Sequence, residues 1–480
     1  MTSASVTQSL PQRRSATIAA RRGFVLVGMN LLVPGSAQLA AGNARLGRAA
    51  MRVWLTLVLA AVALVVAGFA ARGPVLGALA NPVVLTVGCW LVLVVGVAWI
   101  ALLVDAWRIA NPAGMSARGR TTSGALALVL AVVIGTVSWG AHTTLAASAQ
   151  FVDTVFVGGG TQETHDGRIN VLLLGGDAGA GRVGLRPDSI TVASIDADSG
   201  RIVLFGLPRN LQHAPFPADS PLHAKYPGGY YCKSMECMLN AVYTLGENSK
   251  ALFPGVEYPG VEATKGVVEE TLGIPINYWA MIDLAGFRQL IDAVGGITLD
   301  IRTRQPIGIS HDKTGITGWI EPGKNVRLDG YHALWYARAR EGSSDYDRMV
   351  RQKCVLNAMV KQLSPATVAT KFEAIAAAGK NVVATNVPSA EIGTMLDLVT
   401  KSRGLPMGSV SFTPPLIKPA NPDFAKIRQS VADAIAASEA LDEPTPSATP
   451  AATPTASGSP SPKAKPKPQV DDITAVCSVS

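Results

Sequence analysis

The chain has 480 residues, of which 42 are basic and 34 acidic, and 48% are hydrophobic. This composition excludes a mainly disordered chain. The excess positive charge lies in residues 1–150, which contain eleven Arg, no Lys and one acid, Asp105. Because these arginines lie beside long apolar stretches, the charge indicates membrane topology and does not indicate nucleic-acid binding.

Three windows are apolar and long enough to cross about 30 Å of hydrocarbon, namely Val53–Ala70, Val83–Val104 and Gly124–Ala147. Polar residues, Gly and Pro interrupt a fourth window, Phe24–Ala41, which we expect to be interfacial or re-entrant. Ten of the eleven arginines precede the first window or lie between the second and third. The positive-inside rule therefore predicts a multi-pass protein of the cell membrane, with a cytoplasmic N-terminus and everything after residue 150 outside.

A Gly-rich neck at 151–168 precedes a region, 169–365, in which strand and helix patterns alternate. Apolar runs predict strands at Ile169–Leu174, Ser189–Ile195, Arg201–Leu207 and Ile297–Ile301. Helical periodicity predicts helices at Leu284–Val294 and at 345–363. This alternation predicts an α/β fold with a mixed or parallel sheet covered by helices.

Three segments follow this region. Residues 366–440 predict an α/β extension with further helices and a strand at Val410–Thr413. Residues 441–472 form a linker rich in Pro, Thr, Ser, Ala and Lys. The chain continues in a short tail, 473–480, which contains Cys477. We expect this tail to dock back onto the domain.

Five cysteines are present, and Cys89 lies inside a predicted span. The other four, Cys232, Cys237, Cys354 and Cys477, are an even number in a region expected to be oxidising. The short spacing of Cys232 and Cys237 favours a bond between them, which leaves Cys354 to pair with Cys477. Free thiols are the alternative. A zinc site is disfavoured, because no CxxC spacing is present.

Arginine and aspartate recur at the ends of the predicted strands. Asp177 follows the first strand, Arg186 and Asp188 precede the second, and Arg209 follows the third. Further along, Arg338 and Arg340 are two residues apart, so in an extended chain both would point to one face. Asp347 and Arg351 lie one turn apart on a predicted helix, and Gln352 follows them.

Together these residue types describe a site for pyrophosphate and a metal ion. The planar guanidinium suits phosphate oxygens, and a pair of carboxylates suits Mg²⁺. Strand ends at one edge of an α/β sheet are a usual ligand position. Taken singly, each residue has a plainer interpretation as a turn residue, a surface ion pair or a solvated strand face. The joint placement favours the site.

Several ordered motifs resemble the LytR-CpsA-Psr family. They are Ile169–Asp177 (INVLLLGGD), Arg186-x-Asp188-Ser189, Pro208-Arg209, Asn277–Ile301 and Leu328–Leu356. The resemblance covers about residues 165–365, and the later residues are similar to the actinobacterial branch. It implies a three-layer α/β/α sandwich with an apolar pocket for a prenyl chain. It also implies a membrane-anchored phosphotransferase that moves a glycopolymer from a polyprenyl-pyrophosphate carrier to peptidoglycan during cell wall assembly.

The resemblance also implies roles for individual residues. Asp177 and Asp188 match ligands of Mg²⁺ or Mn²⁺, and Arg186, Arg209, Arg338 and Arg340 match residues that bind pyrophosphate. Asp347, Arg351 and Gln352 match later positions, with Asp347 a candidate base or arginine-orienting group. Asn210 stands where many members have Asp, and an amide can donate hydrogen bonds but cannot act as a base.

Two other functions remain open at this stage. A polyprenyl-pyrophosphate phosphatase would use the same site with water as acceptor. The second alternative is a non-catalytic role in the cell envelope, such as that of a cell-envelope-related transcriptional attenuator. The predicted location of the domain outside the membrane and the lack of a basic recognition helix disfavour direct binding to nucleic acid.

Overall fold

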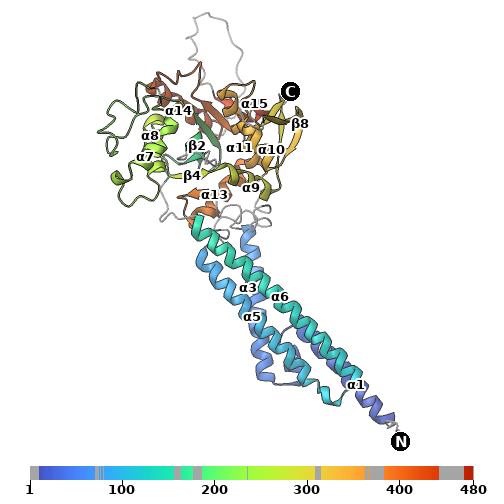
Figure 1. Ribbon diagram of the computed structural model, residues 1–480. Helices are drawn as coiled ribbons and strands as arrows, with labels where there is room; N and C mark the ends of the chain where they lie inside the picture. The colour runs from blue at the N-terminus through green and yellow to red at the C-terminus, as the bar shows by residue number, and fades with distance from the viewer. Residues whose placement is uncertain are drawn as a thin grey trace, which may run out of the picture. The chain divides into compact units, whose positions relative to one another are not determined.

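The computed structural model describes residues 10–70, 75, 77–78, 81–155, 164–176, 186–234, 236–308, 315–362, 367, 383–442 and 470–478. It divides into two compact units, Met1–Gln150 and Phe151–Ser480 (Figure 1).

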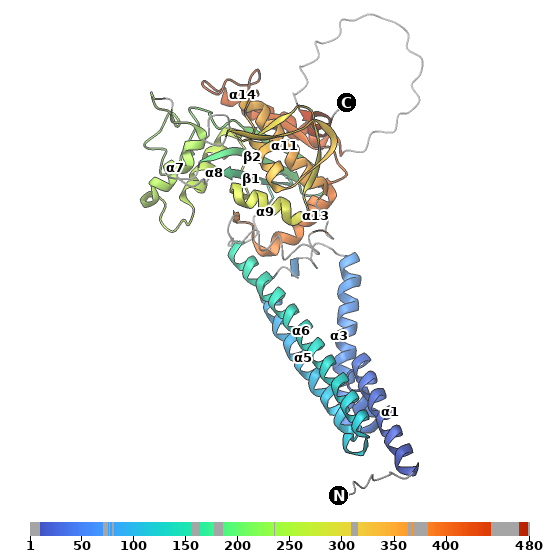
Figure 2. The same cartoon turned by 45° about the vertical axis from the view of Figure 1, so that its right-hand side comes forward.

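The first unit is helical. Its main helices are α1 (Leu10–Leu32), α2 (Ser36–Ala41), α3 (Ala44–Ala70), α5 (Pro82–Ile109) and α6 (Ala117–Val155), with a 3₁₀ turn at Pro112–Gly114. Three stretches are long and apolar enough to cross a membrane, namely Ala44–Gly68, Pro82–Ile109 and Ala117–Gln150. Each of these three stretches contains most or all of one of the apolar windows predicted from the sequence. In Figure 2, α5 and α6 lie side by side, and Trp107 Nε1 donates across them to Ser123 Oγ at 3.2 Å.

The interrupted window Phe24–Ala41 folds as a helix, a break and a short second helix. Gly35 takes a left-handed conformation at φ 95° between α1 and α2. Its N–H donates to the buried Asn30 side chain at 2.7 Å, which satisfies a backbone donor that the break leaves without a helical partner. Gln38, also buried, donates to the carbonyl of Leu102 in α5 at 2.8 Å. The polar residues that interrupt the window therefore stabilise the break.

A seven-stranded sheet forms the centre of the second unit, in the order β11-β10-β3-β2-β1-β4-β9. The strands are β1 (Arg168–Gly176), β2 (Pro187–Asp196), β3 (Ile202–Leu207), β4 (Tyr278–Ile282), β9 (Val383–Thr385), β10 (Gly408–Ser411) and β11 (Asp471–Asp472). The pairs β1–β4 and β3–β10 are parallel and the other pairs are antiparallel, so the sheet is mixed.

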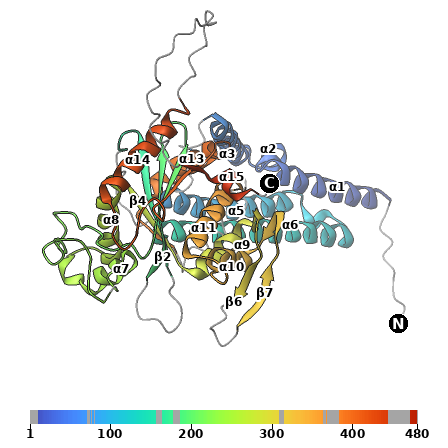
Figure 3. The ribbon, with the colours of Figure 1, turned by 90° about the horizontal axis from the view of Figure 1, so that it is seen from above.

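Helices cover both faces of this sheet and make a three-layer sandwich. Successive residues of β1 alternate between two cores: Leu172 and Leu174 face one, Ile169 and Val171 the other. The first core is closed by α7 (Leu239–Asn248), α8 (Pro259–Leu272) and α14 (Phe424–Glu439). The second is closed by α11 (Asp345–Gln362), α13 (Ile392–Ser402) and α15 (Ile473–Cys477). Figure 3 shows α7 and α8 on the opposite side of the sheet from α11.

A third core packs against α11. It joins α9 (Leu284–Val294) and α10 (Gly330–Arg338) to a two-stranded sheet of β5 (Ile297–Ile301) and β8 (Gly323–Leu328). A separate hairpin, β6 (Gln305–Gly308) with β7 (Ile316–Ile320), contributes Ile307 and Ile320. Two further 3₁₀ turns lie at Lys250–Leu252 and Ser389–Glu391.

Two local predictions are wrong. Tyr336–Arg338 is not extended, because it forms the end of α10, a helix that Asp329 caps by accepting from His332 N at 2.9 Å. The chain becomes extended only at Ala339, with φ −51° and ψ 133°. The strand expected at Val410–Thr413 begins two residues earlier, at Gly408, and the extension joins the central sheet through β9 and β10.

The structure contains two disulfide bonds, Cys232–Cys237 and Cys354–Cys477, with Cα atoms 5.4 and 5.6 Å apart. Cys89 is a buried free thiol, 2.9 Å from Nδ1 of His142.

Candidate active site

A cavity of about 590 Å³ lies at the end of the central sheet where β1 stops and β2 starts. One part of its wall is apolar, with Leu173, Met281, Phe287, Leu290, Leu334, Val355, Leu356 and Met359. The other part carries five arginines, Arg186, Arg209, Arg338, Arg340 and Arg348, together with Asp188, Asn240 and Gln352. Along α11 the lining changes from Arg348 and Gln352 to Val355, Leu356 and Met359, so the cavity has a cationic part and an apolar part.

The antiparallel pairing of β1, β2 and β3 brings their polar ends together. The register pairs Gly175 with Ser189 and Ile190 with Leu207. The segment after β1, the segment before β2 and the segment after β3 therefore lie at the same end of the three strands. The carbonyl of Arg209 accepts from Asn240 N at 3.0 Å, at the start of α7. This bond fixes the turn that carries Arg209.

Asp188 is the carboxylate around which the arginines gather. Oδ1 accepts from Arg209 Nη1 at 2.7 Å, Oδ2 accepts from Arg340 Nη2 at 3.3 Å, and Arg348 Nη1 lies 3.9 Å from Oδ2. Burial raises the pKa of Asp188, but the hydrogen bond from Arg209 and the charges of the three arginines outweigh it. The pKa of Asp188 is thus below its ordinary value, and the carboxylate is ionised at neutral pH.

Asp345 is a second carboxylate of this cluster, and the sequence predictions did not include it. It lies 3.1 Å from Arg348 Nη2, 3.6 Å from Arg209 Nε and 3.6 Å from Arg340 Nε. Asp188 and Asp345 therefore hold the same three arginines from two directions. The spacing of Asp345 and Arg348, one turn apart on a helix, was a signal for this pair.

Arg348 is the most deeply buried of these arginines, with 3% of the residue exposed. Its Nη2 donates to the carbonyl of Asp188 at 3.0 Å. Burial lowers the pKa of Arg348 to about 10, with Arg340 and Arg209 adding to the effect and Asp345 and Asp188 opposing it. Arg348 remains protonated at neutral pH. The sequence does not single out Arg348, because helical spacing alone does not show that Arg348, and not Arg351 of the same helix, lines the cavity.

The remaining arginines of the cavity are Arg186 and Arg338. Arg186 immediately precedes β2. The guanidinium of Arg338, at the end of α10, lies 5.6 Å from the ring centroid of Trp335, which also lines the cavity. Five arginines thus face three acidic lining residues, Asp188, Asp283 and Glu341, and Asp345, which pairs with three of them. This excess of positive charge suits a polyanionic group.

Three predicted residues lie outside the lining of this cavity. Asp347 forms a capping box with Ser344: Ser344 N and Oγ each donate to its carboxylate at 2.8 Å, and Ser344 Oγ accepts from Asp347 N at 3.1 Å. The backbone hydrogen bond from Ser344 lowers the pKa of Asp347. Asp347 therefore starts a helix, and the geometry does not support its assignment as a base.

The other two are Arg351 and Asn210. Arg351 is buried and donates to the carbonyls of Tyr336, at 2.9 Å, and Ala339. It supports the loop that carries Arg338 and Arg340, so its predicted contact with substrate is replaced by a structural role. Asn210 is exposed in the turn after β3. Gln352, in contrast, lines the cavity and lies 3.4 Å from the carbonyl of Ala337.

The carboxylates of the cluster fit a hard cation in their chemistry. Carboxylate oxygens are the ligands that Mg²⁺ prefers, and Asp345 Oδ1 is buried and makes no hydrogen bond, although Arg348 Nη2 lies 3.1 Å from it. Asp177, the other predicted ligand, lies outside the described residues. Within the described part of the chain, no group of three or more His, Cys, Asp or Glu could hold a metal ion. A complete ligand set would need Asp177 or the oxygens of a bound phosphate.

The fold and the site define an α/β protein with a cavity that arginines and apolar side chains line together. The sequence matches the model of the LytR_cpsA_psr family over residues 140–413, more than half of the chain. The chain therefore belongs to the LytR-CpsA-Psr family.

Individual relatives are distant. The regulatory protein MsrR of Staphylococcus aureus (strain COL) is 27% identical over 229 residues, which cover 48% of this chain and 59% of MsrR. The polyisoprenyl-teichoic acid–peptidoglycan teichoic acid transferase TagV of Bacillus subtilis (strain 168) is 26% identical over 275 residues, 54% of this chain and 62% of TagV. The chain thus spans about three fifths of the length of these relatives.

Solved structures of the family also match. The crystal structure of Bacillus subtilis TagV has a TM-score of 0.41 and 24% identity, covering 57% of this chain and 99% of that one. The structure of TagT bound to LI-WTA has a TM-score of 0.40 and 20% identity; the match covers 57% of this chain and 92% of the TagT chain.

Proposed function

We propose that this protein is a membrane-anchored phosphotransferase that moves a glycopolymer from a polyprenyl-pyrophosphate carrier to peptidoglycan. The observation that carries the proposal is the cavity itself, apolar along one wall and lined by five arginines in another part. An apolar chain joined to a pyrophosphate combines the same two chemistries. Membership of the family, and the transferase activity in the name of TagV, support the choice of reaction.

The reaction forms one phosphorus–oxygen bond and breaks another. A hydroxyl of peptidoglycan attacks the phosphorus next to the glycopolymer, and the bond from this phosphorus to the bridging oxygen breaks. Polyprenyl phosphate leaves, the hydroxyl proton passes to it or to water, and a phosphodiester joins glycopolymer to peptidoglycan. Such transfers depend mainly on positioning and on neutralising negative charge.

The arginines supply both effects. Arg209, Arg340 and Arg348 come from three different elements, and each forms an ion pair with both Asp188 and Asp345. Their planar donor groups match the geometry of phosphate oxygens. Asp188, with Asp177, would hold Mg²⁺ or Mn²⁺, which when bound supplies further positive charge to the pyrophosphate.

The membrane location is part of the proposal. Three apolar helices and the distribution of arginine favour a cytoplasmic N-terminus and a domain outside the membrane, where peptidoglycan lies. A reporter fused after Ala147 should be active only outside, and one fused near Ala113 only inside. The reverse pattern would contradict this topology.

The activity can be tested with the full chain in detergent, a lipid-linked glycopolymer and peptidoglycan fragments. Transfer gives a glycopolymer joined to peptidoglycan. Release of polyprenyl phosphate and free glycopolymer phosphate without this product would indicate a phosphatase instead. No reaction of the folded protein with any polyprenyl-linked donor would favour a non-catalytic envelope protein.

A further inference from the structure

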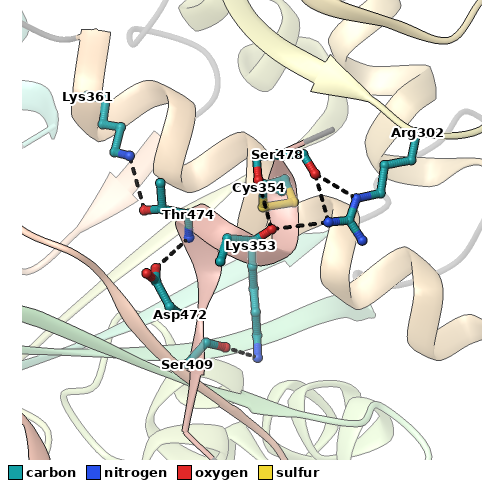
Figure 4. The surroundings of a disulfide bond; sticks show 10 residues. Arg302, Lys353, Cys354, Lys361, Ser409, Asp472, Thr474 and Ser478 are labelled. Carbon is teal, nitrogen blue, oxygen red and sulfur yellow. Dashed lines mark hydrogen bonds between the residues drawn. A yellow bond between two sulfur atoms is a disulfide. The ribbon is translucent and has the colours of Figure 1, made fainter. Parts of the chain in front are cut away.

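Helix α11 has two faces with different contacts. Arg348, Gln352, Val355, Leu356 and Met359 recur at helical spacing and line the cavity. Lys353 and Cys354 point away from it, toward β10 and the tail that contains β11 and α15 (Figure 4). The position of the cavity wall therefore depends on what holds the second face.

Lys353 joins this second face to β10. Its ammonium donates to Ser409 Oγ at 2.6 Å, to Ser411 Oγ at 2.7 Å and to the carbonyl of Val410 at 3.1 Å. Only 2% of the residue is exposed. Gly206 of β3 leaves space for it, because a Cβ there would lie 2.9 Å from Lys353 Cε. A buried lysine that finds three acceptors on one strand fixes the helix to that strand.

Cys354 joins the same face to the tail. It is bonded to Cys477 in α15, across 123 residues of sequence. Ile473 of the tail is buried in the core on this side of the sheet, against which Val360 of α11 also packs. Two basic residues hold the tail from outside, as Figure 4 shows: Lys361 Nζ donates to Thr474 Oγ1 at 3.0 Å, and Arg302 Nη2 donates to the carbonyl of Ser478 at 2.7 Å.

These contacts make a closed ring. Ser409 accepts from Lys353 and pairs with Asp471 in β11. From Asp471 the tail runs to Cys477, which returns to Cys354, the neighbour of Lys353. We call this ring the α11 clasp: Lys353, Cys354, Ser409, Ser411 and residues 471–477.

We propose that the α11 clasp is a positioning element for donor binding, and that opening its disulfide weakens binding of the lipid-linked pyrophosphate. Arg348 and Gln352 lie less than two turns from Lys353 and Cys354 on one rigid helix, so a shift of the clasp moves them directly. A misplacement of about 1 Å can reduce activity by about 100-fold. The proposal rests on the proposed function for the identity of the donor.

The redox step is an ordinary exchange. A dithiol reductant gives two electrons and two protons to Cys354–Cys477, which becomes two thiols, and the reductant becomes a disulfide. The tail then remains attached to the domain by non-covalent contacts, those of Ile473, Thr474 and Ser478 among them.

The test compares clasp variants with a matched control in the full chain in detergent. Cys354→Ala with Cys477→Ala removes the covalent contact, and Lys353→Met removes the ammonium. Gln362→Ala is the control, since it removes the hydrogen bonds of α11 to Thr298 N and O, at 2.8 and 2.7 Å, without touching the clasp. Cys232→Ala with Cys237→Ala controls for reduction of the other disulfide.

Two quantities are measured well below the melting temperature. One is hydrogen exchange of the amides of 348–352, and the other is KM and kcat for the lipid-linked donor. We expect exchange at least ~10-fold faster and KM at least ~10-fold higher in the clasp variants, with kcat within about threefold, and no change in either control. Reduced wild-type protein should behave like the double cysteine variant.

The two proposals fail in different ways. Unchanged exchange at 348–352 in the disulfide variant would overturn the clasp, whatever the activity. Loss of activity only in proportion to unfolded protein would do the same, because it would show a purely structural role. Faster exchange together with an inactive wild type would support the clasp as the element that positions α11 and overturn the proposed function. If Lys353→Met does not fold, the clasp proposal is tested by hydrogen exchange and KM in the double cysteine variant and in the reduced wild type.

Discussion

The two ends of strands β1–β3 both carry arginines and carboxylates, in opposite proportions. At one end, Arg168 and Arg201 meet three carboxylates, Asp196, Glu439 and Asp442. At the other end, five arginines line the cavity against three acidic lining residues. We refer to these as the closed end and the cavity end.

The geometry of the closed end explains the difference. Arg201 Nε donates to both oxygens of Asp442 at 3.0 Å, and Arg168 Nε donates to Ser194 Oγ at 2.8 Å. These arginines are buried and form ion pairs with carboxylates of the protein itself. At the cavity end, Arg340 is exposed and shares the carboxylates of Asp188 and Asp345 with two other arginines. Only the cavity end therefore retains positive charge for an external anion.

The largest expected effect is on transfer at the cavity end. Arg340→Ala should lower transfer at least ~100-fold, about 2.7 kcal/mol of barrier, because it removes a guanidinium from the transferred phosphate. Arg340→Lys should recover only part of the activity, since a point charge lacks the planar donor group. The measurement is the initial rate of transfer with melting temperature on the same preparation. Wild-type rates in Arg340→Ala would remove the cavity end from the mechanism.

A second substitution tests the closed end. Arg201→Ala should lower the free energy of unfolding by about 2 kcal/mol, because it leaves Asp442 without its buried cationic partner. Its activity per folded molecule should stay at the wild-type value. Denaturant unfolding and transfer rates on the same sample check this. A large loss of rate with unchanged stability would mean that the closed end also takes part in the reaction.

Binding of an inorganic anion sharpens the comparison further. Pyrophosphate at ten times its Kd should stabilise the wild type and Arg201→Ala by about 1.4 kcal/mol, since it binds the folded state alone. Arg340→Ala should show a clearly smaller shift in melting temperature at the same concentration. Equal shifts in all three proteins would place the anion somewhere other than the cavity.

The smallest expected effect is on the loss of folding stability at low pH. The hydrogen bond from Arg201 lowers the pKa of Asp442 below its ordinary value, so its contribution to stability is present above about pH 4 and is lost as pH falls through the lowered pKa. Arg201→Ala should reduce the fall in stability below pH 4 by less than about 1 kcal/mol, because the carboxylate is partly exposed. Unfolding at several pH values between 2.5 and 5 measures the slope. An identical slope in wild type and variant would show that this pair is not coupled to acid unfolding.

Much of the fold was readable from the sequence because it depends on local patterns. Continuous apolar runs predicted β1, β2 and β3, and helical periodicity predicted α9 and α11. The polar residues at the strand ends, Arg186, Asp188 and Arg209, do line one cavity. Antiparallel neighbours necessarily bring these ends together, which is why the pattern was informative.

Other parts depend on contacts that spacing does not show. Two aspartates, Asp345 and Asp347, lie in the first turn of α11. Asp347 bonds to Ser344 at the start of the helix, which leaves Asp345 to pair with the arginines. The spacing of Ser344 and Asp347 was the available signal for this difference. The helical end of α10 was missed although Asp329 is a cap residue. Lys353 reads as a solvated helical lysine, since its acceptors in β10 lie 56 to 58 residues away in sequence.

The bond between Cys354 and Cys477 also changes what a protease could do to this chain. Residues 443–469 connect α14 to the docked tail and lie within the covalent loop that the disulfide closes. A single cut anywhere in this segment would leave two polypeptides still joined through sulfur. Such a nicked molecule would keep its tail against α11 and would migrate as one species until a reductant separated its fragments.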